Sequence, residues 1–141
     1  FSHNIKDKSQ YPRKTYPGDT GFLYSITGKI DYGRLYETAV FLELKRRTSL
    51  SEEISYWKNK TGAECDFVVK EGLKAKEIIQ VVYELENLET EKRELTGVIG
   101  CAKELGLKKG IIITKEKEEE KQIEGIKITF VPLWKWLLEK T

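Results

Sequence analysis

Two carboxylates and one amide in this sequence are spaced so that they could support metal-dependent chemistry. Asp66 stands in ECDFVV, directly before the apolar residues of an expected strand, and Gln80 lies inside IIQVVY, the expected neighbouring strand. Glu37 falls on the main apolar arc of an expected helix. Convergence of the three side chains with a backbone carbonyl would give an oxygen cage for one Mg²⁺ or Mn²⁺ ion. Such an ion activates water and stabilises charge on a phosphodiester.

Each of these three side chains also has a purely structural explanation. Asp66 at a turn or strand start would accept hydrogen bonds from backbone N–H groups. Glu37 would form an ion pair with a basic residue at the rim of the helix. Gln80 in a buried strand would be satisfied by neighbouring backbone groups.

Five basic residues are candidates for contacts with nucleic acid. Residues 1–60 carry 11 Lys and Arg against 7 Asp and Glu, a net charge of +4, whereas residues 61–141 have a net charge of −2. The candidates within this modest basic excess are Lys45, Arg46, Arg47, Lys58 and Lys60. Basic residues at the end of a helix also suit its negative dipole end without any ligand.

Composition excludes several other classes of protein. His3 is the only histidine and stands near one end of the sequence, which argues against a His-rich zinc site and a Ser-His-Asp triad. Cys65 and Cys101 form no C-x-x-C pair, so we expect a reducing, cytoplasmic setting. There is no apolar run of 18 residues and no secretory signal, so we expect no membrane span. The chain begins with Phe1 and contains no Met, and we expect it to be a fragment of a longer chain.

The pattern of apolar residues predicts helices and strands in an α/β order. We expect an extended segment over residues 1–20 and a single domain over residues 21–141. GFLYSI is a short strand or a helical turn, and KEKEEEKQIEG is a charged loop. The expected helices cover 33–47, 87–105 and the residues after Pro132, and the expected strands cover 54–57, 63–69, 78–83, 110–114 and 126–131. Three consecutive strands favour a meander, and the following strand–helix–strand passage favours a parallel crossover.

The resulting expectation is an α/β sandwich in which helices flank a mixed central sheet of about five strands. Its order and spacing resemble the restriction-endonuclease-like fold of PD-(D/E)XK nucleases. They resemble more closely the C-terminal domain of archaeal and bacterial AAA-type ATPases of uncertain function. The segments that carry the resemblance are GRLYETAVFLELKRR, ISYWKNKTGAECDFVV, IIQVVYEL and GIKITFVPLWKWLL.

The resemblance implies a site with one departure from the family pattern. The nuclease fold places an acid on the first helix, an Asp on the second strand and an E-x-K on the third. Glu37 and Asp66 match the first two, and Gln80 stands at the Glu position. Val82 stands at the position of the lysine that would hold the attacking water or the scissile phosphate. Cleavage would then need a cation from another element, for which the candidates are Lys58, Lys60, Lys92 and Arg93.

Two functions from different classes follow. The first is a nucleic-acid-directed accessory domain of an ATPase, with a degenerate or weak Mg²⁺-dependent phosphodiesterase site at Glu37, Asp66 and Gln80. Its partners would be an upstream ATPase module and DNA. The alternative is a non-catalytic module that docks onto the ATPase or another protein.

Overall fold

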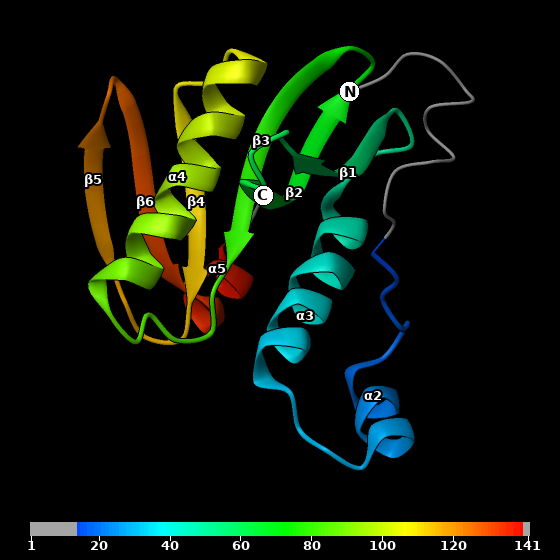
Figure 1. The fold of residues 1–141 in the computed structure, drawn as a ribbon. Helices are drawn as coiled ribbons and strands as arrows, with labels where there is room; N and C mark the ends of the chain where they lie inside the picture. Colours follow the sequence, from blue (N-terminus) through cyan, green and yellow to red (C-terminus); the bar gives the residue numbers. More distant parts are fainter. Residues whose placement is uncertain (1–13, 140–141) are drawn as a thin grey trace.

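The computed structural model describes residues 14–139, in which helices cover both faces of a six-stranded mixed sheet (Figure 1). The α/β class with flanking helices is therefore confirmed. In chain order the elements are α2 (Thr20–Thr27), α3 (Tyr32–Arg47), β1 (Glu52–Lys58), β2 (Glu64–Glu71), β3 (Lys74–Val81), α4 (Leu88–Leu105), β4 (Lys109–Thr114), β5 (Glu119–Ile123), β6 (Ile126–Pro132) and α5 (Leu133–Leu138).

The strands lie in the order β1-β2-β3-β4-β6-β5. The first three pair antiparallel, which confirms the expected meander. β3 and β4 are parallel and α4 connects them, so the expected parallel crossover is also confirmed. β6 continues the parallel half, and β5 pairs antiparallel with it at the edge.

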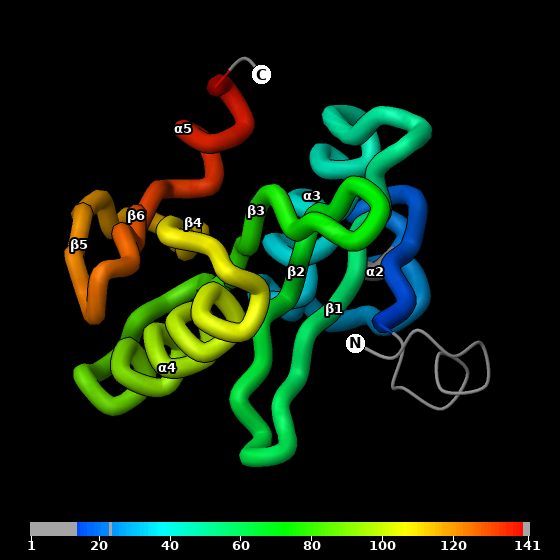
Figure 2. The backbone as a smooth tube through the Cα atoms, turned by 90° about the horizontal axis from the view of Figure 1, so that it is seen from above, coloured from blue at the N-terminus to red at the C-terminus, as the bar shows by residue number. Residues whose placement is uncertain are grey.

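The helices bury a separate apolar core on each face of the sheet. Figure 2 shows α4 on one side of the sheet and α3 and α5 on the other. Neighbouring residues of β3 face opposite cores, because Ile78 belongs to the cluster under α4 and Ile79 to the cluster under α3 and α5. α4 has the expected ends: the Asn87 side chain accepts a hydrogen bond from the Thr90 N–H at 2.8 Å, and Gly106 ends the helix with φ 71°.

The expectation of about five strands, with a loop over KEKEEEKQIEG, is wrong at one edge. Glu119–Ile123 form the sixth strand, β5, which a two-residue turn at Glu124 and Gly125 joins to β6. Both turn residues have positive φ, 52° and 78°, as a tight hairpin requires. The strand is charged because it lies at an exposed edge, where charge discourages pairing with other chains.

The segment before α3 contains one further helix. GFLYSI, expected as a short strand or a helical turn, lies within α2, and the Asp19 side chain caps this helix by accepting the Gly21 N–H at 2.6 Å. Residues 14–19 form neither helix nor strand, and the first 13 residues of the expected extended segment lie outside the described part of the chain. None of the helices in residues 14–139 is long and apolar enough to cross a bilayer.

Candidate acid site at the ends of β2 and β3

Asp66 lies at an irregularity in β2 that changes where its side chain points. The pairing of β1 with β2 shifts between Ser55 and Trp57, so that Tyr56 lies opposite two residues, Asp66 and Phe67. This is the arrangement of a β-bulge, which disturbs the alternation of side chains along a strand. Cys65 and Val68 accordingly both contribute to the core under α4, although they are three positions apart.

Side chains replace ladder hydrogen bonds where β2 and β3 part. The register of the two strands ends with the pair Phe67 and Ile79. Beyond this pair, the Asp66 N–H donates to Gln80 Oε1 at 2.9 Å, and the Val81 N–H donates to Asp66 Oδ2 at 2.9 Å. Asp66 and Gln80 therefore complete the backbone hydrogen bonding of two separating strands, and both residues are buried.

The carboxylates of Glu37 and Asp66 lie on the same side of the sheet and share one cation. Lys14 Nζ donates to Asp66 Oδ1 and lies 3.4 Å from Glu37 Oε2. The Tyr16 hydroxyl donates to the same Glu37 oxygen at 3.2 Å. The helix arc that predicts an inward-facing Glu37 thus does bring it close to Asp66.

Aromatic packing holds the segment that carries Lys14. The ring of Tyr16 stacks on Phe41 of α3, with centroids 4.6 Å apart, and contacts Phe67 of β2 at 5.6 Å. Lys14 Nζ also lies 5.0 Å from the centroid of the Tyr56 ring. Lys14 is therefore fixed over the acid pair by contacts to α3, β1 and β2.

Burial dominates the electrostatics of the acid pair. Burial and the nearby charge of Glu37 raise the pKa of Asp66 to about 6, against the opposing effect of Lys14. Burial lowers the pKa of Lys14, but the carboxylates of Asp66 and Glu37 outweigh it, so the net shift is upward. Lys14 consequently stays protonated at neutral pH, whereas Asp66 gains a proton in mildly acidic solution.

Gln80 is placed beside the acid pair, but its amide is directed elsewhere. Its Nε2 donates to Glu94 Oε2 of α4 at 2.7 Å, while its oxygen accepts from the Asp66 backbone. Glu94 in turn binds Arg93 through Oε1 at 2.7 Å. The structure thus brings Glu37 and Asp66 together at one cation and connects Gln80 to them only through the backbone of Asp66.

The cation at the acid pair is one that the sequence did not single out for this role. Of the expected substitutes for the motif lysine, Arg93 binds Glu94 and Lys58 lies 3.5 Å from Glu64. Val82 is buried in the core under α4. Lys14 comes from an irregular polar segment next to Pro12 and Pro17, where no periodic pattern indicates which way a side chain points.

The donor set in this arrangement does not fit Mg²⁺ or Mn²⁺. Among residues 14–139 there is no group of three His, Cys, Asp or Glu residues placed to hold a metal. The oxygen of Gln80 and one oxygen of Asp66 already accept backbone N–H groups. An ammonium group and a divalent cation cannot both lie between the same two carboxylates.

The five basic candidates fall into two separate groups. Lys45, Arg46 and Arg47 lie at the end of α3, just before β1, whereas Lys58 and Lys60 lie at the opposite end of β1. Arg47 has a structural role: its Nη2 donates to the Trp136 carbonyl at 2.7 Å, and its guanidinium lies 4.3 Å from the Trp136 ring centroid. The candidates therefore do not form one continuous basic surface.

Comparisons with known proteins assign the chain to a family. The chain is 33% identical to the uncharacterized protein MJ1544 of Methanocaldococcus jannaschii, over 98% of this chain and 32% of the relative, so it spans about a third of the length of that relative. It also resembles a chain in the solved half-complex of Thermococcus gammatolerans McrB AAA+ hexamers with bound McrC. That match has a TM-score of 0.51 and 14% identity, and it covers 73% of this chain and 28% of the other, which shows a likeness of fold. Residues 32–136 match the family described as a domain of unknown function, DUF4143, and the chain belongs to that family.

Proposed function

We propose that this chain is a restriction-endonuclease-like accessory domain of an AAA-type ATPase, directed to nucleic acid, in which the phosphodiesterase site is degenerate. The observation that carries the proposal is the position of Lys14, whose ammonium group lies between the carboxylates of Glu37 and Asp66. A nuclease of this fold would hold a divalent cation against such an acid pair. Here the protein supplies its own cation, and the acids form an internal ion cluster.

Two comparisons support the association with an ATPase. The relative from Methanocaldococcus jannaschii extends well beyond the aligned third, which leaves room for a further module in proteins of this type. The solved assembly with a similar fold contains AAA+ hexamers. We therefore propose an ATPase module in the same longer chain as the principal partner.

A cleavage assay tests the degenerate site. The domain is mixed with nicked, branched and single-stranded DNA in Mn²⁺, as wild type and as Asp66→Asn, which keeps an oxygen for the Val81 N–H. We expect neither protein to cut. Cleavage by wild type that Asp66→Asn abolishes would contradict the degenerate site and establish an active nuclease.

A binding assay tests the direction toward nucleic acid. Lys58 and Lys60 are the basic candidates on the β1–β2 hairpin, whose second strand carries Asp66. If they contact about two phosphates, log K should fall with log salt with a slope of about −2, and Lys58→Gln/Lys60→Gln should remove most of that slope. Lys74→Gln is the matched control, because Lys74 is exposed at the other end of the β2–β3 pair. Equal slopes for wild type and the double variant would contradict the binding of nucleic acid through Lys58 and Lys60.

A second candidate function is a non-catalytic module that docks onto the ATPase or another protein. The specific observation in its favour is apolar exposure on two helices, at Phe22, Tyr24 and Ile26 of α2 and at Trp134 and Leu138 of α5. No DNA binding at low salt, together with a stable complex with the ATPase module, would select this function over the first.

A further inference from the structure

The helix α2 and the loop after it form an apolar surface with little support from the rest of the fold. Four large apolar residues within this short stretch are between 53% and 66% exposed: Phe22, Tyr24, Ile26 and Ile30. Figure 1 shows α2 beside the beginning of α3 and away from the sheet. A helix of eight residues is marginal in water without packing partners, so this surface has the character of a binding site.

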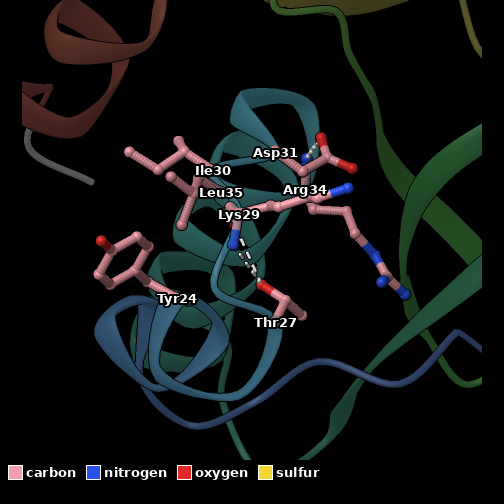
Figure 3. A pocket seen from close by; sticks show the side chains of 7 residues that line it. All are labelled: Tyr24, Thr27, Lys29, Ile30, Asp31, Arg34 and Leu35. Carbon is pink, nitrogen blue, oxygen red and sulfur yellow. Dashed lines mark hydrogen bonds between the residues drawn. The ribbon is translucent and has the colours of Figure 1, made fainter.

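A pocket of about 250 Å³ opens between α2 and the first turn of α3 (Figure 3). Tyr24, Ile30 and Leu35 line one side of it, and the side chains of Lys29 and Arg34 extend on the other side. Sites for drug-sized ligands begin at about 300 Å³. The pocket is therefore of a size for a single anchoring side chain rather than for a complete cofactor.

The polar side of the pocket carries positive charge that the fold does not neutralise. Lys29 and Arg34 have no ion pair with any residue in the described range 14–139. Asp31, the acid beside them, accepts the Arg34 N–H at 3.0 Å and so serves as the cap of α3. Two cations against one carboxylate leave a net positive rim, which complements an acidic ligand.

We propose that this pocket binds an acidic segment of a partner protein, with one aromatic side chain of that segment inserted between Tyr24, Ile30 and Leu35. Carboxylates that flank the aromatic residue pair with Lys29 and Arg34. An apolar anchor with a charged rim is the usual anatomy of a protein docking site. A peptide suits the site better than nucleic acid, because two of the three anchor residues, Ile30 and Leu35, are aliphatic and give a base little ring surface to stack on. The inference is independent of the acid pair and of any nuclease ancestry.

A pair of small probes with the same ring and opposite charge tests the proposal. Amide chemical shifts of the ¹⁵N-labelled protein are followed during titration with indole-3-propionate and, separately, with tryptamine. We expect saturable shifts confined to residues 24–35, with indole-3-propionate binding about fivefold more tightly, the effect of one exposed ion pair. Lys29→Glu/Arg34→Glu should reverse the preference, Ile30→Asp should abolish both titrations, and Lys74→Glu should change neither.

Three results would overturn the proposal. Equal affinity for the two probes would show that the rim selects no charge. Absence of saturable shifts at residues 24–35 would show that the pocket binds no aromatic anchor. An oligonucleotide such as dT₁₀ that shifts these residues while indole-3-propionate does not would assign the surface to nucleic acid instead.

Discussion

Asp66 is a charged residue whose burial costs the protein stability at neutral pH. It is 4% exposed, lies beside Glu37 and, among residues 14–139, has one cationic partner, Lys14. A carboxylate in such surroundings is retained either because the backbone needs its oxygens or because a function needs its charge. Two substitutions separate these contributions.

Asp66→Asn should change how stability depends on pH. Burial and the charge of Glu37 raise the folded-state pKa of Asp66 from 3.8 to about 6. The folded protein therefore binds the proton more tightly, so this contribution to stability is complete below pH 4 and is lost as the pH rises through 6. Its full size is about 3 kcal/mol at most, from about two pKa units. Urea unfolding between pH 4 and 7 should show this loss in wild type relative to Asp66→Asn, and parallel curves for the two proteins would contradict the raised pKa.

Lys14→Met should destabilise the domain and create an affinity for divalent cations. Without the ammonium group, two neighbouring carboxylates repel each other, and unfolding at pH 7 should become easier by about 1–3 kcal/mol. Isothermal titration with Mn²⁺ should then show weak binding that wild type lacks, because Glu37 and Asp66 Oδ1 lose their cation whereas Asp66 Oδ2 and the Gln80 oxygen still accept backbone N–H groups. Lys45→Met, on the exposed surface of α3, is the control. Mn²⁺ binding by wild type as strong as by Lys14→Met would show that Lys14 does not compete for the site.

The sequence predicts part of this site because periodicity places side chains. The apolar arc of residues 33–47 puts Glu37 toward the sheet, and the position of Asp66 at the start of a buried run puts it at the same place. It could not predict Lys14, because an irregular segment has no repeat from which a direction can be read. It also could not predict that the bulge in β2 opposite Tyr56 changes the alternation around Asp66 and that Gln80 turns toward Glu94.

At the scale of elements, α4 approaches β2 so closely that only glycine fits. A Cβ on Gly97 would lie 2.3 Å from the Glu64 carbonyl oxygen, whereas a Cβ on Gly100 would meet the Trp57 ring at 3.3 Å. The backbone of a strand cannot move aside as the edge of a side chain can. The distance between α4 and the strand that carries Asp66 is thus set at Gly97.

Gly97→Ala should therefore destabilise the protein, although alanine favours helices. Helix propensity alone would make either alanine variant more stable than wild type by up to about 1 kcal/mol. The clash at Gly97 should reverse this sign and cost about 1–3 kcal/mol. Urea unfolding of Gly97→Ala and Gly100→Ala compares two positions on one helix, and equal stability of the two variants would contradict the close approach.

Arg47 joins α3 to α5, and Arg47→Ala should destabilise the domain by weakening the contact between these helices. The guanidinium reaches the Trp136 carbonyl at 2.7 Å and the Glu139 carbonyl at 3.1 Å, and its side chain is 10% exposed. Loss of these charged hydrogen bonds should lower the free energy of unfolding by about 2 kcal/mol. In the described part of the chain, the neighbouring Arg46 pairs only with Glu43 on the surface, so Arg46→Ala should have a smaller effect in the same urea titration. A larger loss for Arg46→Ala would contradict this assignment.

The elements themselves differ in how far a sequence can specify them. The ends of α4 are predictable because Asn87 and Gly106 have the chemistry of a helix cap at each end. β5 is not, because EEKQI has few apolar residues and pairs only at an exposed edge of the sheet. Strand propensity identifies strands whose side chains are buried. It misses a strand such as β5, which is stabilised mainly by backbone hydrogen bonds to the neighbouring strand.

At the scale of the whole molecule, the family match covers the two carboxylates of the acid site but not the cation between them. The match begins at residue 32, the first residue of α3, so Lys14, Tyr16 and α2 lie before it. The sheet with α3, α4 and α5 contains both apolar cores apart from the contribution of Tyr16. The segment before α3 is therefore an addition to a nearly complete fold.

Removal of residues 1–31 should leave a folded domain with an open acid pair. We expect one cooperative urea transition at lower denaturant, because the stacking of Tyr16 on Phe41 and Phe67 is lost. Amide chemical shifts of α4, β4 and β6 should stay as in the whole chain. A truncated protein without a cooperative transition would show that the segment is part of the fold rather than an addition to it.

The reciprocal hydrogen bonds of Asp66 and Gln80 with the backbone have a consequence for any comparison among relatives. Because these side chains tie two diverging strands together, selection for a properly folded sheet would preserve them in a lineage that had never hydrolysed a phosphodiester or had long ceased to do so. An aspartate at this position can therefore be explained by the structure of the sheet alone. Evidence for descent from a nuclease must come from a residue that has no structural role of this kind. Glu37 is the residue to follow, since no backbone group in the described chain relies on its carboxylate.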